Sequence, residues 1–445
     1  MYIEKNFVSL FSGALGLDIG LEKAGFKLKA IVDCNNIAIQ TAKLNLKRLD
    51  SDAYVAEVKM EMGNIDSICR NIIYRTKLKK GQLYLLAGAP PCQPFSTAGK
   101  RQSVMDARGD GFAIFLRAVR IFRPKYFVIE NVKGVLSAAK KHRPLAERGS
   151  EFPPLKTEEE QGSAFMEILD NMDELCREIG YCVSWGVLNA ADFGSPQSRE
   201  RLIIIGSLEG KFVWPVPTYS IDGKNRTKKW LTLRDALFDL SDGTPLYKEL
   251  NEEVSSYLKL IPAGGNWRNL PEYMHKDAIG GAFFSWGGRS GFLRRISWDK
   301  PSPTVTQNPA AKATMLCHPE GNRPLSVREC ARIQQFPDEW VFAGNITDQY
   351  RQIGNATPIA LAEAVGISIN KAEKIKGAYK KSLYCAVPDL LNRMVRRPRT
   401  MLNPPILRKE KDLEKAKYWL KNAGQGREGF SKYQTFKPIA NGQAL

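Results

Sequence analysis

The fold is decided by the stretch FVSLFSGALGL at residues 7–17. Its first five residues are mostly apolar, which predicts a strand buried on both faces of a parallel sheet. A turn containing Gly13 and Gly16 follows, and the apolar spacing beyond it predicts a helix that stops at Gly25. A strand, a glycine turn and a helix in this order are typical of a ligand site in doubly wound α/β proteins, although the same residues also suit a purely structural turn.

An acidic residue after the second predicted strand supports a ligand at this turn. Asp33 comes about 20 residues after Gly13, where a carboxylate can hold the two hydroxyls of a ribose. The glycines are spaced as G-x-x-G rather than as the G-x-G-x-x-G of dinucleotide folds. The spacing therefore favours a nucleoside ligand other than a nicotinamide dinucleotide.

Strand and helix patterns alternate over about the first 200 residues. Further apolar strands are predicted at 28–32, 83–87, 126–129 and 201–205, and helices at 112–122 and 165–179. This alternation predicts an α/β fold with a parallel, doubly wound, Rossmann-like sheet.

The texture changes after about residue 208, where periodicity fades and Trp, Gly, Arg and Asn accumulate. A helical pattern returns near Ile359 and is expected to pack back on the first domain. We therefore expect a catalytic domain over 1–208 that is completed by 342–375, a smaller irregular domain over 209–341, and a basic extension over 376–445.

The composition indicates a globular protein with a polyanionic partner. Of 445 residues, 43% are hydrophobic, which is enough for a large core. Lys and Arg number 66 against 47 Asp and Glu, and this net charge of +19 favours nucleic acid, although a merely basic surface is the alternative. The eight cysteines and three histidines have no zinc-type spacing, so no metal site is expected and the thiols suit a reducing cytoplasm. No apolar run is long enough to span a membrane.

A proline-rich loop presents one cysteine differently from the others. The predicted strand 83–87 leads into GAPPCQPFS at residues 88–96, and strand ends carry the ligand sites in this fold class. The prolines stiffen the backbone around Cys92, so its thiol is better placed for nucleophilic attack than for packing, although a buried inert cysteine is the alternative. The glycine-rich residues 96–111 suit a mobile lid.

Three charged residues beside predicted strands are further candidates for the site, and Glu130 is expected at the same rim of the sheet as Cys92. Glu130 ends the predicted strand that begins at Tyr126, and a carboxyl in a partly dry pocket can donate a proton near neutral pH. Arg199 and Arg201 lead into the next strand on one face of it, where they could hold a carbonyl oxygen or a phosphate. A salt-bridged Glu and solvated arginines are the structural alternatives.

Together these motifs resemble those of the DNA (cytosine-5)-methyltransferases, in particular the modification enzymes of type II restriction systems. The shared order is Phe-x-Gly-x-x-Gly, Pro-Cys-Gln, Glu-Asn-Val and Gln-x-Arg-x-Arg, followed by similar segments at 323–337 and 352–356. The resemblance runs from about Phe7 to Ala364. It implies a methyltransferase domain dependent on S-adenosylmethionine, with a target-recognition domain at 209–341.

The resemblance implies that S-adenosylmethionine binds the first glycine turn. The residues implied around this cofactor are Phe11, Gly13, Leu15, Gly16, Asp33, Asn64, Ile65, Pro90, Asn355 and Ala356. Two positions depart from the family pattern, since Asn64 stands where Asp is usual and Cys34 where an aromatic residue often stacks on adenine.

The resemblance also implies a covalent mechanism on a cytosine that is rotated out of the duplex. Cys92 would attack C6 of the ring, and Glu130 would contact N3 and the exocyclic amine. Arg201, helped by Arg199, would hold the O2 carbonyl. The residues expected at the DNA are Gln93, Ser96, Lys100, Arg101, Arg108, Arg294 and Arg295.

Other functions are weighed against this one. The long block between Arg201 and Arg323 favours double-stranded DNA over the tRNA of a related cytosine-5 methyltransferase. A catalytically inactive DNA-binding relative would lack Cys92 or Glu130, and both are present. We expect a monomeric cytoplasmic enzyme, without a membrane partner, that is paired functionally with a restriction endonuclease.

Overall fold

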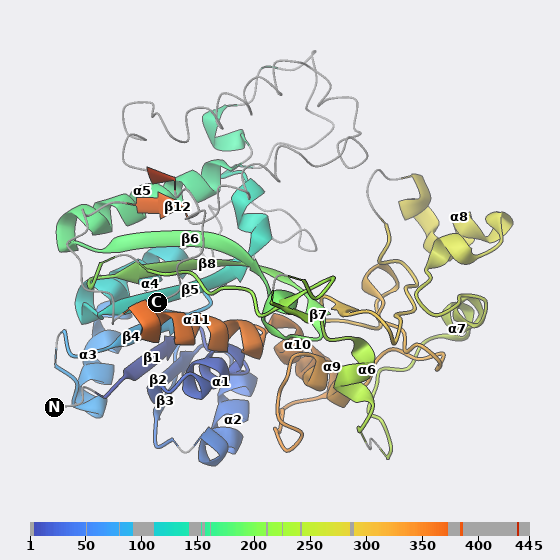
Figure 1. The fold of residues 1–445 in the computed structure, drawn as a ribbon, viewed down its shortest axis with the longest axis horizontal. Coiled ribbons are helices and arrows are strands. Elements are labelled where there is room, and N and C mark those ends of the chain that lie inside the picture. The colour runs from blue at the N-terminus through green and yellow to red at the C-terminus, as the bar shows by residue number, and fades with distance from the viewer. Residues whose placement is uncertain are drawn as a thin grey trace.

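The computed structural model describes the chain from residue 4 to residue 372 apart from several gaps, together with two short strands beyond (Figure 1). The gaps cover residues 50, 80, 92–110, 142–152, 154–155, 161, 211, 225, 241–242 and 285–288. The predicted basic extension lies outside the described residues except for 383–385 and 434–435. None of the described helices is long and apolar enough to cross a membrane.

A large sheet forms the centre of the molecule, with strand order β13-β12-β6-β8-β5-β4-β1-β2-β3 (Figure 1). Its strands are β1 Asn6–Leu10, β2 Lys27–Asp33, β3 Tyr54–Glu57, β4 Leu85–Gly88, β5 Tyr126–Val132, β6 Cys182–Asn189, β8 Glu200–Ser207, β12 Leu383–Cys385 and β13 Gln434–Thr435. β1 is buried throughout and pairs in parallel with β2 and β4, as its apolar sequence predicts. The predicted α/β fold is confirmed.

The prediction of a wholly parallel sheet is wrong at β8, which runs antiparallel to both β5 and β6. The reason lies in the connection between β6 and β8. It consists of the short 3-10 turn η5 at Ala190–Phe193 and the two-residue strand β7 at Gln197–Ser198, whereas a parallel partner needs a crossover of a dozen or more residues. The reversal brings the start of β8 to the carboxyl end of β5.

Helices cover both faces of this sheet (Figure 1). One face carries α1 Gly16–Lys23, α2 Asn36–Asn45 and α11 Ile359–Ala372, and the other carries α3 Ile65–Thr76, α4 Gly111–Phe122 and α5 Ser163–Ile179. Successive residues of β5 serve the two cores in turn, with Tyr126 and Val128 in one and Phe127 and Ile129 in the other. α4 and α5 confirm the two amphipathic helices predicted from the sequence.

The last of the described helices packs closely against the first. α11 contacts α1 along its length, and the two backbones approach each other at Gly20. A Cβ at this position would lie 2.6 Å from the carbonyl oxygen of Ile359 and 2.7 Å from the amide nitrogen of Glu363. A Cβ on Gly366 would lie 2.6 Å from that of Ala24. Glycine at both positions therefore allows α11 to join the helix that carries the first turn.

Residues beyond β8 form a smaller unit with its own core. The unit contains α7 Glu252–Lys259 and α8 His275–Ile279, which lie away from the sheet in Figure 1. Its buried residues are Val254, Leu258, Ile261, Trp267, Leu270, Ala278, Ile279, Leu293, Met315 and Cys317.

The domain predicted over 209–341 thus divides between two cores. α6 Leu233–Leu237 and α9 Val327–Ile333 contribute side chains to the core beneath α1 and α11, as does Trp340. The separate core involves residues between 254 and 317. The segments on either side of it therefore belong to the packing of the main sheet.

We expect Gly20→Ala to destabilise the protein, because the added methyl group meets backbone atoms of α11 that cannot turn away. Overpacking costs about 1–3 kcal/mol, so the Tm measured by scanning calorimetry should fall by several degrees. Gly243→Ala is the matched control, since a Cβ there would meet nothing within 4 Å. Equal Tm values for the two variants would contradict this account of the helix pair.

Candidate active site

The turn between β1 and α1 is a strained piece of backbone. Phe11 and Leu15 have φ values of 56° and 71°, in the left-handed region that favours glycine, and Gly13 has a φ of 53°. Such strain persists only where the surrounding structure enforces it, and it is concentrated at functional sites. Leu15 is fully buried, so its packing holds the turn in this form. A Cβ on Gly13 would meet nothing within 4 Å, so the turn faces open space there.

Asp33 ties the end of β2 to this turn. Its carboxylate accepts a hydrogen bond from the amide nitrogen of Gly13 at 2.8 Å and another from that of Asn35 at 2.8 Å. Burial raises the pKa of Asp33, and the two N–H groups oppose that rise. The structure brings Asp33 and Gly13 together, while the contact of Asp33 with a ribose stays a prediction.

Asn64 and Ile65 lie at the start of α3, and both side chains contact other parts of the protein. The Asn64 side chain accepts from the amide nitrogen of Glu61 at 2.8 Å and donates to the carbonyl oxygen of Lys59 at 2.8 Å. Ile65 is fully buried in the core. Asn64 therefore closes the loop before α3, and a contact from either residue to a cofactor stays a prediction.

A buried ion pair between Glu130 and Arg201 forms the centre of the site. Arg201 Nε lies 2.8 Å from Glu130 Oε1, and the two side chains are 10% and 6% exposed. The antiparallel register explains the contact, because Arg201 stands opposite Val132 and so shares a face with Glu130 two residues away. The structure thus brings together the acid and the second arginine of the two predicted motifs.

The Glu130 carboxyl is balanced between burial and positive charge. Burial raises its pKa, which holds the proton closer to neutral pH than on an exposed glutamate. Arg201, Arg199 and a hydrogen bond with the Thr357 hydroxyl all work against this rise in pKa. A carboxyl in such a balance can share a proton with a substrate ring near neutral pH.

Arg199 lies near Glu130 but is bonded to protein backbone. It is 1% exposed, and its guanidinium donates to the carbonyl oxygens of Val305 at 2.7 Å, Gly354 at 2.8 Å and Ala356 at 3.0 Å. It falls between β7 and β8, where the regular alternation of a strand is interrupted. These bonds occupy both terminal nitrogens of the guanidinium with protein backbone, and the predicted help of Arg199 at a substrate carbonyl stays a prediction.

Asn131 is a further residue of the site, and it fixes the start of the cysteine loop. Its side-chain amide donates to the carbonyl oxygen of Pro90 at 3.1 Å, and both residues are buried. The signal for it in the sequence is its place beside Glu130 in the Glu-Asn-Val motif. The predicted residues Cys92, Gln93, Ser96, Lys100, Arg101 and Arg108 lie outside the described part of the chain.

A buried pair of glutamines links β7 to the end of α10 (Ile346–Asn355). Gln197 donates to Gln334 Oε1 at 2.6 Å, and Gln334 donates to the carbonyl oxygens of Ile353 at 2.7 Å and Ala356 at 3.1 Å. An amide can donate and accept at once, so it can connect such groups in a chain. Gln197 opens the Gln-x-Arg-x-Arg motif, but a motif alone does not identify a partner 137 residues away.

Arg295 is buried inside the smaller unit. It is 4% exposed, and its guanidinium donates to the carbonyl oxygens of Leu258 and Ile261 and, at 2.9 Å, to that of His318. The structure does not support its predicted phosphate contact, because these bonds use its donors to join segments of the small core. Arg294 is half-buried, and burial lowers its pKa. Its phosphate contact stays a prediction.

Cysteines outside the proline loop are mostly unreactive. Those that are buried among the described residues are Cys69, Cys176, Cys182, Cys317 and Cys330. Burial raises the pKa of Cys69 and Cys176 to about 12, so both thiols stay protonated at neutral pH. Within the described ranges, no three His, Cys, Asp or Glu side chains are grouped so that they could hold a metal ion.

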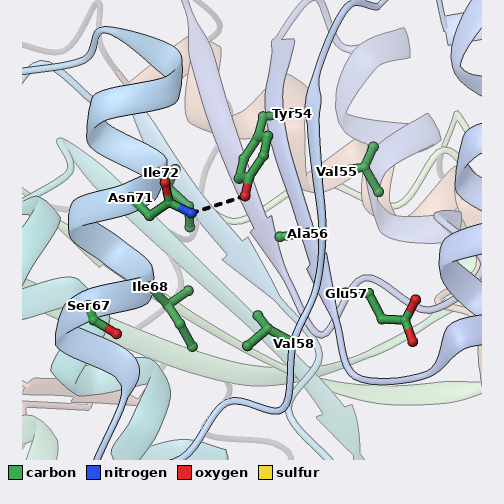
Figure 2. Close-up of a pocket in the computed structure, with 9 residues that line it drawn as sticks. All are labelled: Tyr54, Val55, Ala56, Glu57, Val58, Ser67, Ile68, Asn71 and Ile72. Carbon is green, nitrogen blue, oxygen red and sulfur yellow. Dashed lines mark hydrogen bonds between the residues drawn. The ribbon is translucent and has the colours of Figure 1, made fainter.

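A groove lies between β3 and α3 (Figure 2). Asn71 Nδ2 donates to the Tyr54 hydroxyl at 3.0 Å between its two walls. The groove is lined by Tyr54, Val55, Ala56, Glu57, Val58, Ser67, Ile68, Asn71 and Ile72. The predicted cofactor residues are not among them, so the groove is not the predicted cofactor pocket.

A doubly wound α/β sheet, a strained glycine turn and a buried acid–arginine pair, with Asn131 beside the acid holding Pro90, define the class of a methyltransferase. A sequence profile of the C-5 cytosine-specific DNA methylases matches residues 5–371, and the chain therefore belongs to this family. The protein is an enzyme of the DNA (cytosine-5)-methyltransferase class, as the resemblance of its motifs implied.

Individual relatives agree with this assignment. The type II methyltransferase M.Sau96I of Staphylococcus aureus is 34% identical over 82% of this chain and 75% of its own length. M.PspPI of a Psychrobacter species is 36% identical over 82% of this chain and 78% of its own. M.Eco47II of Escherichia coli is 35% identical over 81% and 78%.

A solved structure shares the fold. It is described as a DNA modification methyltransferase encoded within a prophage of Escherichia coli. It is 21% identical, with a TM-score of 0.52, and covers 82% of this chain and 99% of its own. At this identity the similarity concerns the fold alone.

We expect Arg199→Lys to lower thermal stability, because one ammonium group cannot span carbonyl oxygens from separate segments. Each buried acceptor left without a donor costs about 1–3 kcal/mol, so the Tm should fall by several degrees. Arg177→Lys is the control, since the Arg177 side chain is 62% exposed and pairs with Asp173 on the surface. A wild-type Tm for Arg199→Lys would show that Arg199 does not hold these segments.

Proposed function

We propose that the protein transfers a methyl group from S-adenosylmethionine to C5 of a flipped-out cytosine in a specific double-stranded DNA sequence. The observation that carries the proposal is the buried Glu130–Arg201 pair, with its 2.8 Å contact. It lies on the strand whose Asn131 holds Pro90, from which the Cys92 loop departs. The type II relatives support the further proposal that methylation protects DNA in the cytoplasm from a cognate restriction endonuclease.

The turn after β1 fits S-adenosylmethionine. The open backbone at Gly13 and the N-terminus of α1 suit the carboxylate of its amino-acid part, and Asp33 stands beside them for its ribose. We assign Phe11 and Asn355 to the walls of the same pocket. When bound, the cofactor supplies an electrophilic methyl group.

The residues of the chain make the cytosine ring reactive. The Cys92 thiolate adds to C6, and the electrons of the C5–C6 double bond move toward C5. Glu130 holds N3 and the exocyclic amine, while Arg201 holds O2, so the charge that develops on the ring is stabilised in a buried site. After methylation the C5 proton is lost, the double bond re-forms and the bond from C6 to the Cys92 sulfur breaks.

We assign DNA recognition to the smaller unit around residues 254–317. Its surface combines cationic and aromatic groups, as base readout and stacking require. The exposed Arg268 guanidinium lies 4.8 Å from the centre of the Trp267 ring, which is itself buried in the core of the unit, and the aromatic side chain of Tyr273 is 77% exposed. In this arrangement residues 1–208 and 342–375 supply the catalytic domain, together with the segments on either side of the smaller unit that pack on the main sheet.

The decisive experiment is to incubate the protein with genomic DNA and S-adenosylmethionine and to map the modified bases by sequencing. We expect 5-methylcytosine at one defined sequence in double-stranded DNA. Transfer to tRNA without transfer to duplex DNA would overturn the proposal, and so would methylation of an exocyclic amine.

We expect Cys92→Ala to lower the turnover rate by about 10³-fold or more, because the ring then lacks its nucleophile. Wild-type protein should also form a denaturation-resistant adduct with DNA that carries 5-fluorocytosine at the target, since fluorine at C5 cannot leave as a proton does. The same DNA with ordinary cytosine is the control. An adduct with Cys92→Ala, or undiminished turnover, would exclude the covalent role of this residue.

A further inference from the structure

The segment Gly354–Thr357 lies between the cofactor turn and the buried acid. Hydrogen bonds from buried side chains fix its main chain in place. Arg199 donates to the carbonyl oxygens of Gly354 at 2.8 Å and Ala356 at 3.0 Å. Gln334 donates to the second of these carbonyl oxygens at 3.1 Å. All three of these bonds are buried.

The main chain of Thr357 touches the cofactor turn directly. A Cβ on Gly16 would clash with the carbonyl oxygen of Thr357 and would lie 3.3 Å from its amide nitrogen. The same Cβ would lie 3.1 Å from that of Ala356. Only glycine at residue 16 permits this approach. A shift of the turn would therefore displace the main chain of Thr357.

The side chain of Thr357 reaches the opposite partner, Glu130. Thr357 is 3% exposed, and its hydroxyl faces the Glu130 carboxyl, whose pKa it lowers. Arg201 and Arg199 are the charged groups that face the same carboxylate. Thr357 is therefore the neutral donor among them, and it comes from the element that also contacts the cofactor turn.

We propose that Thr357 is a positioning residue that joins the cofactor turn to the catalytic acid. Its main chain rests on Gly16, and its hydroxyl sets the orientation of the Glu130 carboxylate toward the target base. The inference rests on the proposed function, since it gives Glu130 a target base to hold.

The test compares Thr357→Val, which keeps the shape and removes the hydroxyl, with Thr357→Ser, which keeps the hydroxyl. We expect Thr357→Val to lower kcat by about tenfold or more, the effect of losing a hydrogen bond to a charged group. The Kd for S-adenosylhomocysteine, measured by calorimetry, should stay within about threefold of the wild-type value, because the main chain at Gly16 is unchanged. Thr357→Ser should recover most of the rate.

The pH profile separates positioning from a general loss of structure. The hydroxyl lowers the pKa of Glu130 against the effect of burial, so its removal raises that pKa. If transfer needs the protonated acid, activity is present below this pKa and is lost above it, and the alkaline limb of Thr357→Val moves to higher pH.

Three results would overturn the inference: a wild-type rate and pH profile for Thr357→Val, an equal defect in Thr357→Ser, or a loss of S-adenosylhomocysteine binding together with a lower Tm in Thr357→Val. A wild-type protein that methylates no DNA would instead refute the proposed function. The two failures can be distinguished. The Thr357 inference fails only if the wild-type enzyme is active, whereas the proposed function fails if the wild-type enzyme is inactive on DNA.

Discussion

The guanidinium of Arg199 joins parts of the chain that are far apart in the sequence. Its carbonyl partners are Val305, 106 residues away, and Gly354 and Ala356, 155 and 157 residues away. Because these groups are buried, the loss of any one bond is costly, and the segments keep a single arrangement. The β8 strand that begins beside Arg199 carries Arg201 to Glu130, so the ion pair depends on the same anchor. The turn at Gly16 rests on the segment that Arg199 holds.

Local features of this protein could be predicted from its sequence, because they depend on neighbouring residues. The apolar spacing predicted α4 and α5, and the position of Asp33 after the second strand predicted an acidic residue for the site at the first turn, where it does contact Gly13. The direction of β8 could not be predicted from its apolar sequence, since buried parallel and antiparallel strands look alike. It is set by the short connection through η5 and β7.

The roles of the arginines also could not be predicted from the sequence. Arg199, Arg201 and Arg295 are equal in charge, and each was expected to bind a ligand, although only Arg199 and Arg201 belong to a motif. In the structure Arg201 meets a carboxylate, while Arg199 and Arg295 bind backbone carbonyl groups. What separates them is burial among distant segments, which sequence spacing does not contain. The thiol of Cys92 was singled out by its prolines, and its surroundings lie outside the described residues.

The close approach of α1 and α11 at Gly20 and Gly366 has a consequence for the modular design of this enzyme. The two helices come from opposite sides of the inserted unit, yet they share one core. If the chain were cut within that unit, one fragment would carry α1 and the other α11. We expect the two fragments to associate through the contact of these helices at Gly20 and Gly366. If this unit recognises DNA, as we propose, an exchange of the unit between relatives would change the DNA sequence that is bound and leave the core shared by α1 and α11 in place.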